Sequence, residues 1–218
     1  MKKLSMCVVL VMAVLNVSVY ATTIIGNWEN GSSNGWIDWG NGQSITNSVN
    51  ASKYSFSTVG ATSGSSSLEV TKTGWNQNLS IKLQNNGLVD KFMANNKFLI
   101  DVTVPADAFL NGTGGYAQIY NVSLNAQGYG WHDMFTTTPA LNFYFWNGSP
   151  ERTATLEFDY SAAKALMPAM PSWVEIIIAT NSDSKRGVFY LDNARLVPEP
   201  ATIAFLSLGL ILFKKRNY

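Results

Sequence analysis

The chain has 218 residues, a formal net charge of +1 and hydrophobic residues at 46% of its positions. Without its two ends, residues 22–197 contain ten Lys or Arg and thirteen Asp or Glu, a net charge of −3. The absence of a basic patch argues against a nucleic-acid-binding protein. Seven tryptophans and nine tyrosines argue against a disordered chain, which would be poor in aromatic residues.

The first 21 residues have the pattern of a secretory signal peptide. Lys2 and Lys3 give a positive start, residues 4–14 are apolar, and Val19-Tyr20-Ala21 suits a signal peptidase, so we expect cleavage after Ala21. An N-terminal membrane anchor is the alternative. The single cysteine, Cys7, lies in this segment. The rest of the chain therefore has no thiol for a disulfide, a cysteine zinc site or a cysteine nucleophile.

Residues 22–196 have the size of one domain, and β-branched or alternating runs between turn signals predict strands along it. In chain order, strands are expected at 24–29, 54–56, 67–71, 79–83, 97–104, 116–124, 141–146, 153–160, 173–180 and 188–197. Short helices are expected at 88–94 and 161–166. This spacing predicts an all-β fold, a β-sandwich of the jelly-roll type. A signal-peptide helix and a short C-terminal membrane helix would flank it.

Three motifs follow one another along this domain. Asn27-Trp28-Glu29 with Gly35-Trp36 comes first, residues 62–70 read TSGSSSLEV, and residues 189–196 read FYLDNARL. Their order resembles the galactose-binding-like jelly roll of many carbohydrate-binding modules. The resemblance spans nearly the whole of residues 22–196. It implies a domain that binds a polysaccharide.

The same resemblance implies a structural calcium ion beside the first and last strands. Glu29 and Asp192 are the acidic residues in those strands, and they would be its carboxylate ligands. Calcium takes six to eight oxygen ligands, so backbone carbonyls near Ser65 would complete the set. The alternative is that Glu29 caps a turn and Asp192 accepts backbone amides.

Aromatic side chains are the candidate ligand contacts. Sugars present flat C–H faces that pack on aromatic rings. Trp36 and Trp39 flank Ile37-Asp38 in a Gly-rich loop, and Trp131 follows Tyr129-Gly130. One face of the strand at 116–124 would carry Tyr116, Gln118 and Tyr120. Packing in the core is the alternative for each of them, and it is the expectation for Trp28 and Trp173.

The search for catalytic groups favours a protein without enzymatic activity. His132 is the only histidine, and no Gly-x-Ser-x-Gly motif accompanies it. Glu157 and Asp159 would share one face of a strand, roughly 7 Å apart, as two glycosidase carboxylates could. A retaining β-glucanase family uses Glu-x-Asp-x-x-Glu, but Ala162 stands at the third acidic position. We expect these acids to be ordinary residues of the sheet surface.

Residues 197–218 form a three-part C-terminal signal. Pro198-Glu199-Pro200 cannot be helical, residues 201–213 are apolar, and Lys214-Lys215-Arg216 would stay on the cytoplasmic side. This arrangement resembles the PEP-CTERM sorting signal, which implies processing by an exosortase-type protease. Thirteen helical residues span about 20 Å, against about 30 Å of hydrocarbon, which favours a transient hold in the inner membrane. A permanent tail anchor is the alternative.

The sequence thus predicts a signal peptide at 1–21, a β-sandwich domain at 22–196 and a sorting signal at 197–218. We expect an exported protein of the cell surface or extracellular matrix that binds exopolysaccharide without cleaving it. A structural or adhesive matrix protein without a sugar ligand is the second hypothesis, and a glycan-cleaving enzyme is the third.

Overall fold

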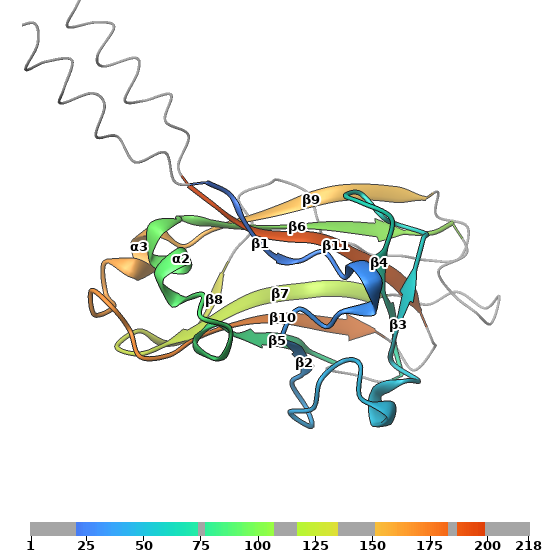
Figure 1. Cartoon of the computed structure of the whole chain (residues 1–218), viewed down its shortest axis with the longest axis horizontal. Coiled ribbons are helices and arrows are strands. Elements are labelled where there is room, and N and C mark those ends of the chain that lie inside the picture. The colour runs from blue at the N-terminus through green and yellow to red at the C-terminus, as the bar shows by residue number, and fades with distance from the viewer. Residues whose placement is uncertain (1–20, 74–76, 107–116, 135–150, 183–186, 199–218) are drawn as a thin grey trace, which may run out of the picture.

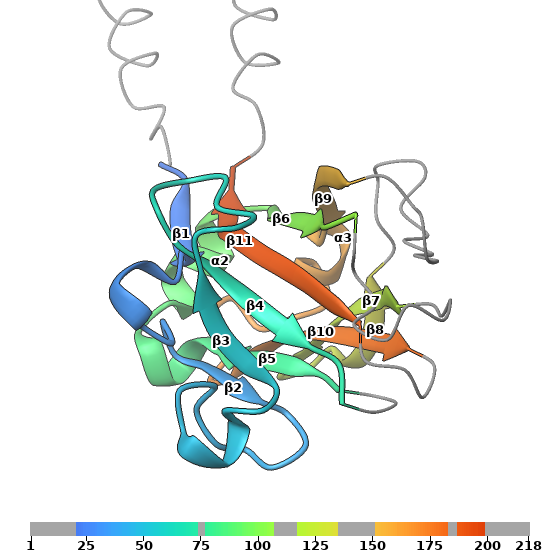
Figure 2. The same cartoon turned by 90° about the vertical axis from the view of Figure 1, so that its right-hand side faces the viewer.

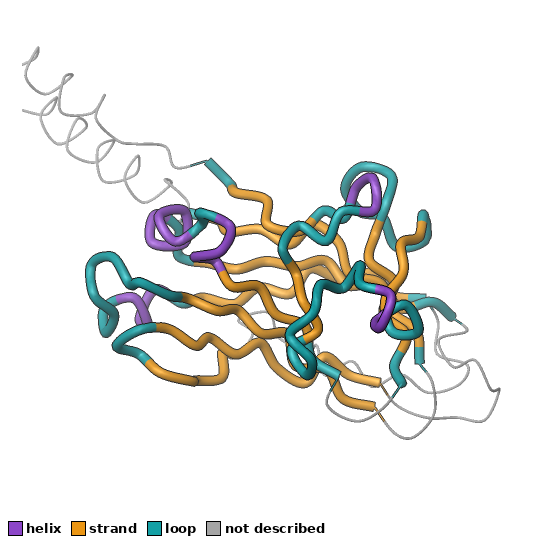
Figure 3. Tube along the Cα trace, turned by 60° about the horizontal axis from the view of Figure 1, so that its bottom comes forward, coloured by secondary structure: helices purple, strands orange, loops and turns teal. Residues whose placement is uncertain are grey.

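The structure is a computed structural model, which describes residues 21–73, 77–106, 117–134, 151–182 and 187–198. Two layers of antiparallel strands make up most of it, as Figure 1 and Figure 3 show. Strands consecutive in sequence often lie in different sheets, a connectivity expected of jelly rolls. The predicted β-sandwich is therefore confirmed.

The first sheet contains six strands within the described residues. Its order is β3 (Tyr54–Ser57), β4 (Ser67–Thr71), β11 (Val188–Val197), β6 (Lys97–Val104) and β9 (Arg152–Asp159), while β1 (Thr23–Gly26) also pairs with β11. β6 follows one side of β11, so β4 and β1 share its other side, at residues 188–191 and 194–196. Figure 2 shows β4 beside β11.

The second sheet contains five strands of the described chain. Its order is β2 (Trp36–Asp38), β5 (Leu79–Lys82), β10 (Val174–Ser182), β7 (Ala117–Ala126) and β8 (Gly130–Met134). β2 and β8 are thus its opposite edges. The pairing of β10 with β7 shifts register between Ala179 and Thr180, and residues 121 and 119 are the respective partners, so Tyr120 lies at the irregularity.

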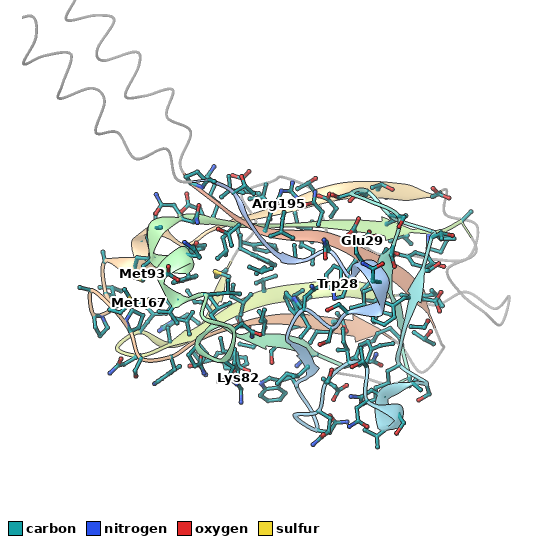
Figure 4. The ribbon with its side chains drawn as sticks, in the orientation of Figure 1. Trp28, Glu29, Lys82, Met93, Met167 and Arg195 are labelled. Carbon is teal, nitrogen blue, oxygen red and sulfur yellow. The ribbon has the colours of Figure 1, made fainter. Side chains whose placement is uncertain are left out.

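The core lies between the two sheets, because alternate residues of each strand point inward. β6 contributes Phe98, Ile100 and Val102, and β10 contributes Val174, Ile176 and Ile178. Trp28 also lies between the layers, as Figure 4 shows, and its ring meets that of Trp36 at a centroid distance of 6.0 Å.

Gly26 is required by this packing. An added Cβ at that position would lie 2.8 Å from Trp36 Nε1 and 2.9 Å from a ring carbon of Trp28. A side chain at residue 26 would therefore displace one of the two buried indoles.

Short helical segments occupy the connections, namely η1 (Glu29–Gly31), η2 (Ser48–Asn50), η3 (Leu83–Asn86), α2 (Val89–Ala94) and α3 (Ser161–Lys164). α2 and α3 meet at one end of the sandwich. The rings of Phe92 and Tyr160 stack at 4.2 Å, and Lys164 Nζ donates to the carbonyls of Met93 and Asn95 at the end of α2. Among the described residues, none belongs to a helix long and apolar enough to cross a membrane.

Most of the predicted strands are present. The limits predicted for β4, β6 and β11 are those of the structure, and the strands at 54–56, 79–83, 153–160 and 173–180 differ from it by one or two residues. The first strand is shorter, ending at Gly26. The short strands β2 and β8 were not predicted, because their segments were interpreted as loops. The expected strand at 141–146, the signal peptide and the apolar part of the tail lie outside the described residues.

Candidate functional site

The outer face of the second sheet carries two exposed tryptophans. Ile176 and Ile178 belong to the core, so Ile177 between them points to this outer face. By the same alternation, Trp131 and Asp133 of β8 point outward with their partners Asn125 and Ser123. Trp39 extends β2, because its amide donates to the Asn78 carbonyl at 2.9 Å, and it points to the same face.

Trp39 and Trp131 meet across this face. Their ring centroids are 5.8 Å apart and their planes are inclined at 64°, an edge-to-face contact. They come from the opposite edges of a five-stranded sheet, so the sheet has to curve toward them, and its outer face is concave. Trp39 is 45% exposed and Trp131 46% exposed, whereas Ile177 on the central strand is fully buried. The two indole rings are therefore accessible to a ligand, whereas the central strand beneath them is covered.

Polar groups surround the two indoles. Ser123 Oγ donates to Asp133 Oδ1 at 2.7 Å, and Ser80 Oγ donates to Glu175 Oε1 at 2.8 Å. Glu175 pairs with Asn125 in the ladder, next to Trp131. Each carboxylate has a second oxygen for which these serines provide no donor. The face therefore combines apolar rings with hydrogen-bond acceptors held in fixed positions.

The structure brings together two of the predicted ligand contacts and removes one. Trp39 and Trp131 are adjacent, although 92 positions separate them in sequence. Trp36 is a correction, since it is fully buried and its Nε1 donates to the Ile25 carbonyl at 2.8 Å. The reason is strand geometry, which turns Trp36 inward and Trp39 outward.

The remaining predicted ligand contacts are only partly described. Tyr116 lies outside the described residues. Gln118 belongs to β7 and pairs with Asn181, and Tyr120 lies at the irregularity of that strand. The side chains of these two residues are not among those described, so their part in ligand contact stays a prediction. Trp28 and Trp173 were both expected in the core. The expectation is confirmed for Trp28 and wrong for Trp173, which is exposed.

The predicted metal ligands hold a loop in place. Glu29 Oε1 accepts the amides of Ser65 and Ser66, at 2.8 and 2.9 Å, and Glu29 Oε2 accepts the Ser65 hydroxyl. Gly64, at a φ of +77°, passes so close that an added Cβ would lie 2.4 Å from Glu29 Oε1. The hydrogen bonds from the Ser65 and Ser66 amides and from the Ser65 hydroxyl lower the pKa of Glu29.

Asp192 holds the start of the same loop. Its Oδ2 accepts the amides of Thr62 and Ser63 at 2.7 and 2.8 Å, and its Oδ1 accepts the Asn193 amide at 2.7 Å. Burial raises the pKa of Asp192, although these amides act in the opposite direction. Glu29 and Asp192 thus both act as acceptors of backbone amides, which was the alternative to metal binding.

Asp101 is a second buried acid in this region, and the sequence pattern did not connect it with Glu29 or Asp192. It pairs with Asp192 across β6 and β11, and Thr62 Oγ1 donates to Asp101 Oδ2 at 2.7 Å. Thr155, Asn193 and Arg195 also donate to it. Burial raises the pKa of Asp101, but the hydrogen bonds and the Arg195 charge outweigh that effect and leave it lowered.

These oxygens do not fit a calcium ion in this arrangement, because N–H and O–H groups already donate to them and calcium requires six to eight oxygens. Within the described residues, no three His, Cys, Asp or Glu side chains are grouped to hold a metal. Calcium at Glu29 and Asp192 stays a prediction that would require residues 62–66 to turn their amides away.

Removal of calcium tests this prediction directly. With both carboxylates bonded to amides, we expect the thermal midpoint to be the same in EGTA and in excess CaCl₂, and magnesium is the control for ionic strength. A midpoint that falls in EGTA and returns only with calcium would establish the ion and show that the loop rearranges around it.

The acids considered for catalysis have structural contacts. Lys97 Nζ donates to Glu157 Oε1 at 2.5 Å across the β6–β9 pair, and Asp159 Oδ1 accepts the Ser161 amide at the start of α3. Burial raises the pKa of Asp159, but the hydrogen bonds from Ser161 and the charges of Lys97 and Lys164 outweigh that effect and leave the pKa lowered. His132 Nε2 lies 3.1 Å from the Tyr129 carbonyl. Each of these groups thus has a local structural role.

A buried charged network lies beneath the edge that carries Trp39. Asp38 accepts Lys53 Nζ at 2.9 Å and the Tyr54 hydroxyl at 2.8 Å. Lys72 is 1% exposed, and its Nζ donates to the carbonyl and hydroxyl oxygens of Thr180. Burial lowers the pKa of Lys72 to about 7, with Asp38 raising it and Lys53 lowering it.

Among solved structures, the chain is similar to several carbohydrate-binding modules. The xylan-binding CBM22-1 of Paenibacillus barcinonensis Xyn10C has 16% sequence identity over 84% of this chain and 100% of its own, with a TM-score of 0.46. CBM27-1 of Caldicellulosiruptor saccharolyticus, in complex with mannohexaose, has 17% identity over 83% and 99%, with a TM-score of 0.48. The family 11 module of Clostridium thermocellum Lic26A-Cel5E has 13% identity over 83% and 96%, with a TM-score of 0.45.

No protein-family model matches the sequence, and no curated protein does. Identities this low leave the function to be decided by the side chains of this chain itself.

Proposed function

We propose that this protein is a non-catalytic carbohydrate-binding protein of the cell surface or extracellular matrix, with exopolysaccharide as its ligand. The observation that supports it is the Trp39–Trp131 pair on the concave face of the second sheet. Sugar rings stack their C–H faces on indoles, and sugar hydroxyls donate to carboxylates. A concave face with apolar rings and a few fixed polar groups has the composition of a ligand site.

The charges on this face favour neutral sugar units. Asp133 and Glu175 are the acids beside the indoles, and the exposed Lys82 follows on β5. Residues 22–197 carry a net charge of −3. A polyanionic chain would be repelled by the exposed Asp133, whereas a neutral polysaccharide would meet an acceptor for its hydroxyl groups there.

Replacement of either indole by alanine is expected to weaken binding to a neutral polysaccharide strongly. Each ring is a central aromatic contact, and truncation of such a contact costs about 2 kcal/mol or more, a loss of about 30-fold in affinity. Affinity electrophoresis of the full chain, solubilised in detergent, through gels that contain different polysaccharides measures this loss.

Val59→Ala is the matched control, since Val59 is 47% exposed but lies in the connection between β3 and β4 of the first sheet. It should leave the affinity unchanged. Wild-type protein that binds no polysaccharide would refute carbohydrate binding and favour the structural or adhesive role. Equal losses from Val59→Ala and Trp39→Ala would refute the proposed site.

Absence of catalysis is part of the proposal. Glu157 bonds to Lys97 and Asp159 accepts the Ser161 amide. Both belong to β9 of the first sheet, so neither lies on the indole face of the second sheet. Release of reducing sugar from a bound polysaccharide, abolished by Glu157→Gln, would overturn this part and revive the glycan-cleaving hypothesis.

Export and sorting complete the proposal. A signal peptidase would cut after Ala21, and an exosortase-type protease would process the segment that begins at Pro198, Glu199 and Pro200. Transient insertion of residues 201–213 into the inner membrane would precede release to the surface. The mass of the protein recovered from the cell surface tests both cuts, and an intact 218-residue chain there would refute them.

A further inference from the structure

One loop of the sandwich exposes large apolar side chains together. Residues 165–173, here called the apolar loop, read Ala-Leu-Met-Pro-Ala-Met-Pro-Ser-Trp and contain no charge. Leu166 is 67% exposed and Met170 60%, and Trp173 is also exposed. Exposed apolar residues grouped in this way mark a contact surface more often than single ones do.

The apolar loop is held firmly by the rest of the domain. Met167 is buried in the core, and the Met167 amide donates to the Lys164 carbonyl. At the other end, the Ser172 amide donates to Gln127 Oε1 at 2.6 Å and the Gln127 amide donates to the Trp173 carbonyl. These contacts fix both ends of the loop, so Leu166 and Met170 are held in place on the surface.

The apolar loop lies at the end of the sandwich where β11 ends. The Asn96 amide donates to the Val197 carbonyl, and the Tyr160 amide donates to the Asn96 carbonyl, directly before α3 and the loop. Figure 1 shows β1 beginning and β11 ending at the side that carries α2 and α3. Figure 4 places Met167 of the loop and Met93 of α2 at this same end.

The sequence that follows β11 limits how far this end lies from a membrane. Five residues lie between Val197 and Ile203 of the apolar run 201–213, and the six extended residue-to-residue steps span at most about 20 Å. Insertion of that run would thus hold the α2–α3 end close to the lipid headgroups while the chain stays uncut.

We propose that the apolar loop rests in the surface of the lipid bilayer and orients the domain on it while the C-terminal run is inserted. An uncharged loop with exposed Leu166 and Met170 suits the acyl boundary, and tryptophan is enriched at membrane interfaces. The thirteen-residue run is short for a span, so a second contact with the same bilayer adds to a weak hold. This role is independent of carbohydrate binding.

A fluorescent probe on the loop tests the proposal. Cys7→Ser removes the only cysteine of the full chain, and Met170→Cys then takes an environment-sensitive label at one site. The matched control is Val49→Cys on η2, because Val49 is 63% exposed and belongs to a different turn. Both labelled chains are reconstituted into phosphatidylcholine vesicles with brominated acyl chains, and flotation confirms that they are bound.

We expect the Met170 label to shift to shorter wavelength and to be quenched by the brominated lipid, and the Val49 label to do neither. Leu166→Glu should reverse both changes at Met170 without releasing the chain from the vesicles. Equal spectra for the two labels on bound chains would overturn the proposal, and so would a chain that does not float. A blue shift without vesicles, together with a doubled mass, would instead assign the loop to self-association and overturn it as well.

Discussion

Lys72→Met should make the stability of this protein nearly independent of pH between 7 and 9. In the wild type, burial lowers the pKa of Lys72 to about 7 in the folded state, against its ordinary value of 10.5. Between these values only the unfolded chain holds the proton, so unfolding takes up a proton. Wild-type stability should therefore rise with pH by about 1.4 kcal/mol per unit in this window.

Below pH 7 the lysine is charged in both states, and the burial of that charge destabilises the folded protein. Methionine fits the same space without charge. The free energy of unfolding of the variant should therefore exceed that of the wild type most at pH 6 and least at pH 9. Loss of the two hydrogen bonds to Thr180 reduces the gain by about 1–3 kcal/mol.

Urea denaturation at pH 6, 7, 8 and 9 measures these free energies. Lys82→Met is the matched control, because Lys82 is exposed on β5 and should keep the wild-type slope. If the free energy of unfolding changes with pH in the same way for the wild type and Lys72→Met, Lys72 stays protonated in the folded protein at every pH tested.

Trp36→Ala should cost about 3–5 kcal/mol of stability, the usual loss for a buried tryptophan. Trp36 is fully buried, contacts Trp28 and donates its Nε1 proton to the Ile25 carbonyl. Its removal leaves a cavity between the first strand and the second sheet and an acceptor without its donor. Thermal unfolding followed by circular dichroism measures the loss.

Trp39→Ala is the natural comparison, because only two residues lie between the two indoles in the chain. It removes a ring that is 45% exposed, so the thermal midpoint should change little while glycan affinity falls. The opposite result, a stable Trp36→Ala variant with lost affinity, would return Trp36 to the ligand site and refute the assignment of the concave face.

The fold was largely predictable because its strands are long and strongly patterned. β6 and β11 have eight and ten residues, many of them β-branched or aromatic, and each ends directly before a proline. In contrast, β2 has only three residues in a Gly- and Asn-rich segment. Its strand character comes from pairing with β5, a contact that no local pattern contains.

The sequence predicted that exposed tryptophans would form the candidate site, but it did not predict correctly which tryptophans these are. Exposed tryptophans were expected, yet the sequence does not tell that Trp36 points inward and Trp39 outward unless β2 is recognised. The contact of Trp39 with Trp131 depends on the curvature of a whole sheet. The pairing of Asp101 with Asp192 depends on the register of β6 and β11, which residue types alone do not fix.

The position of β11 has a mechanical consequence. This strand is bonded to β6 along one side and to β4 and β1 along the other, and it leads directly into residues 198–218. A pull transmitted through Val197 acts along β11, so its ladder bonds are sheared together and are not opened one at a time.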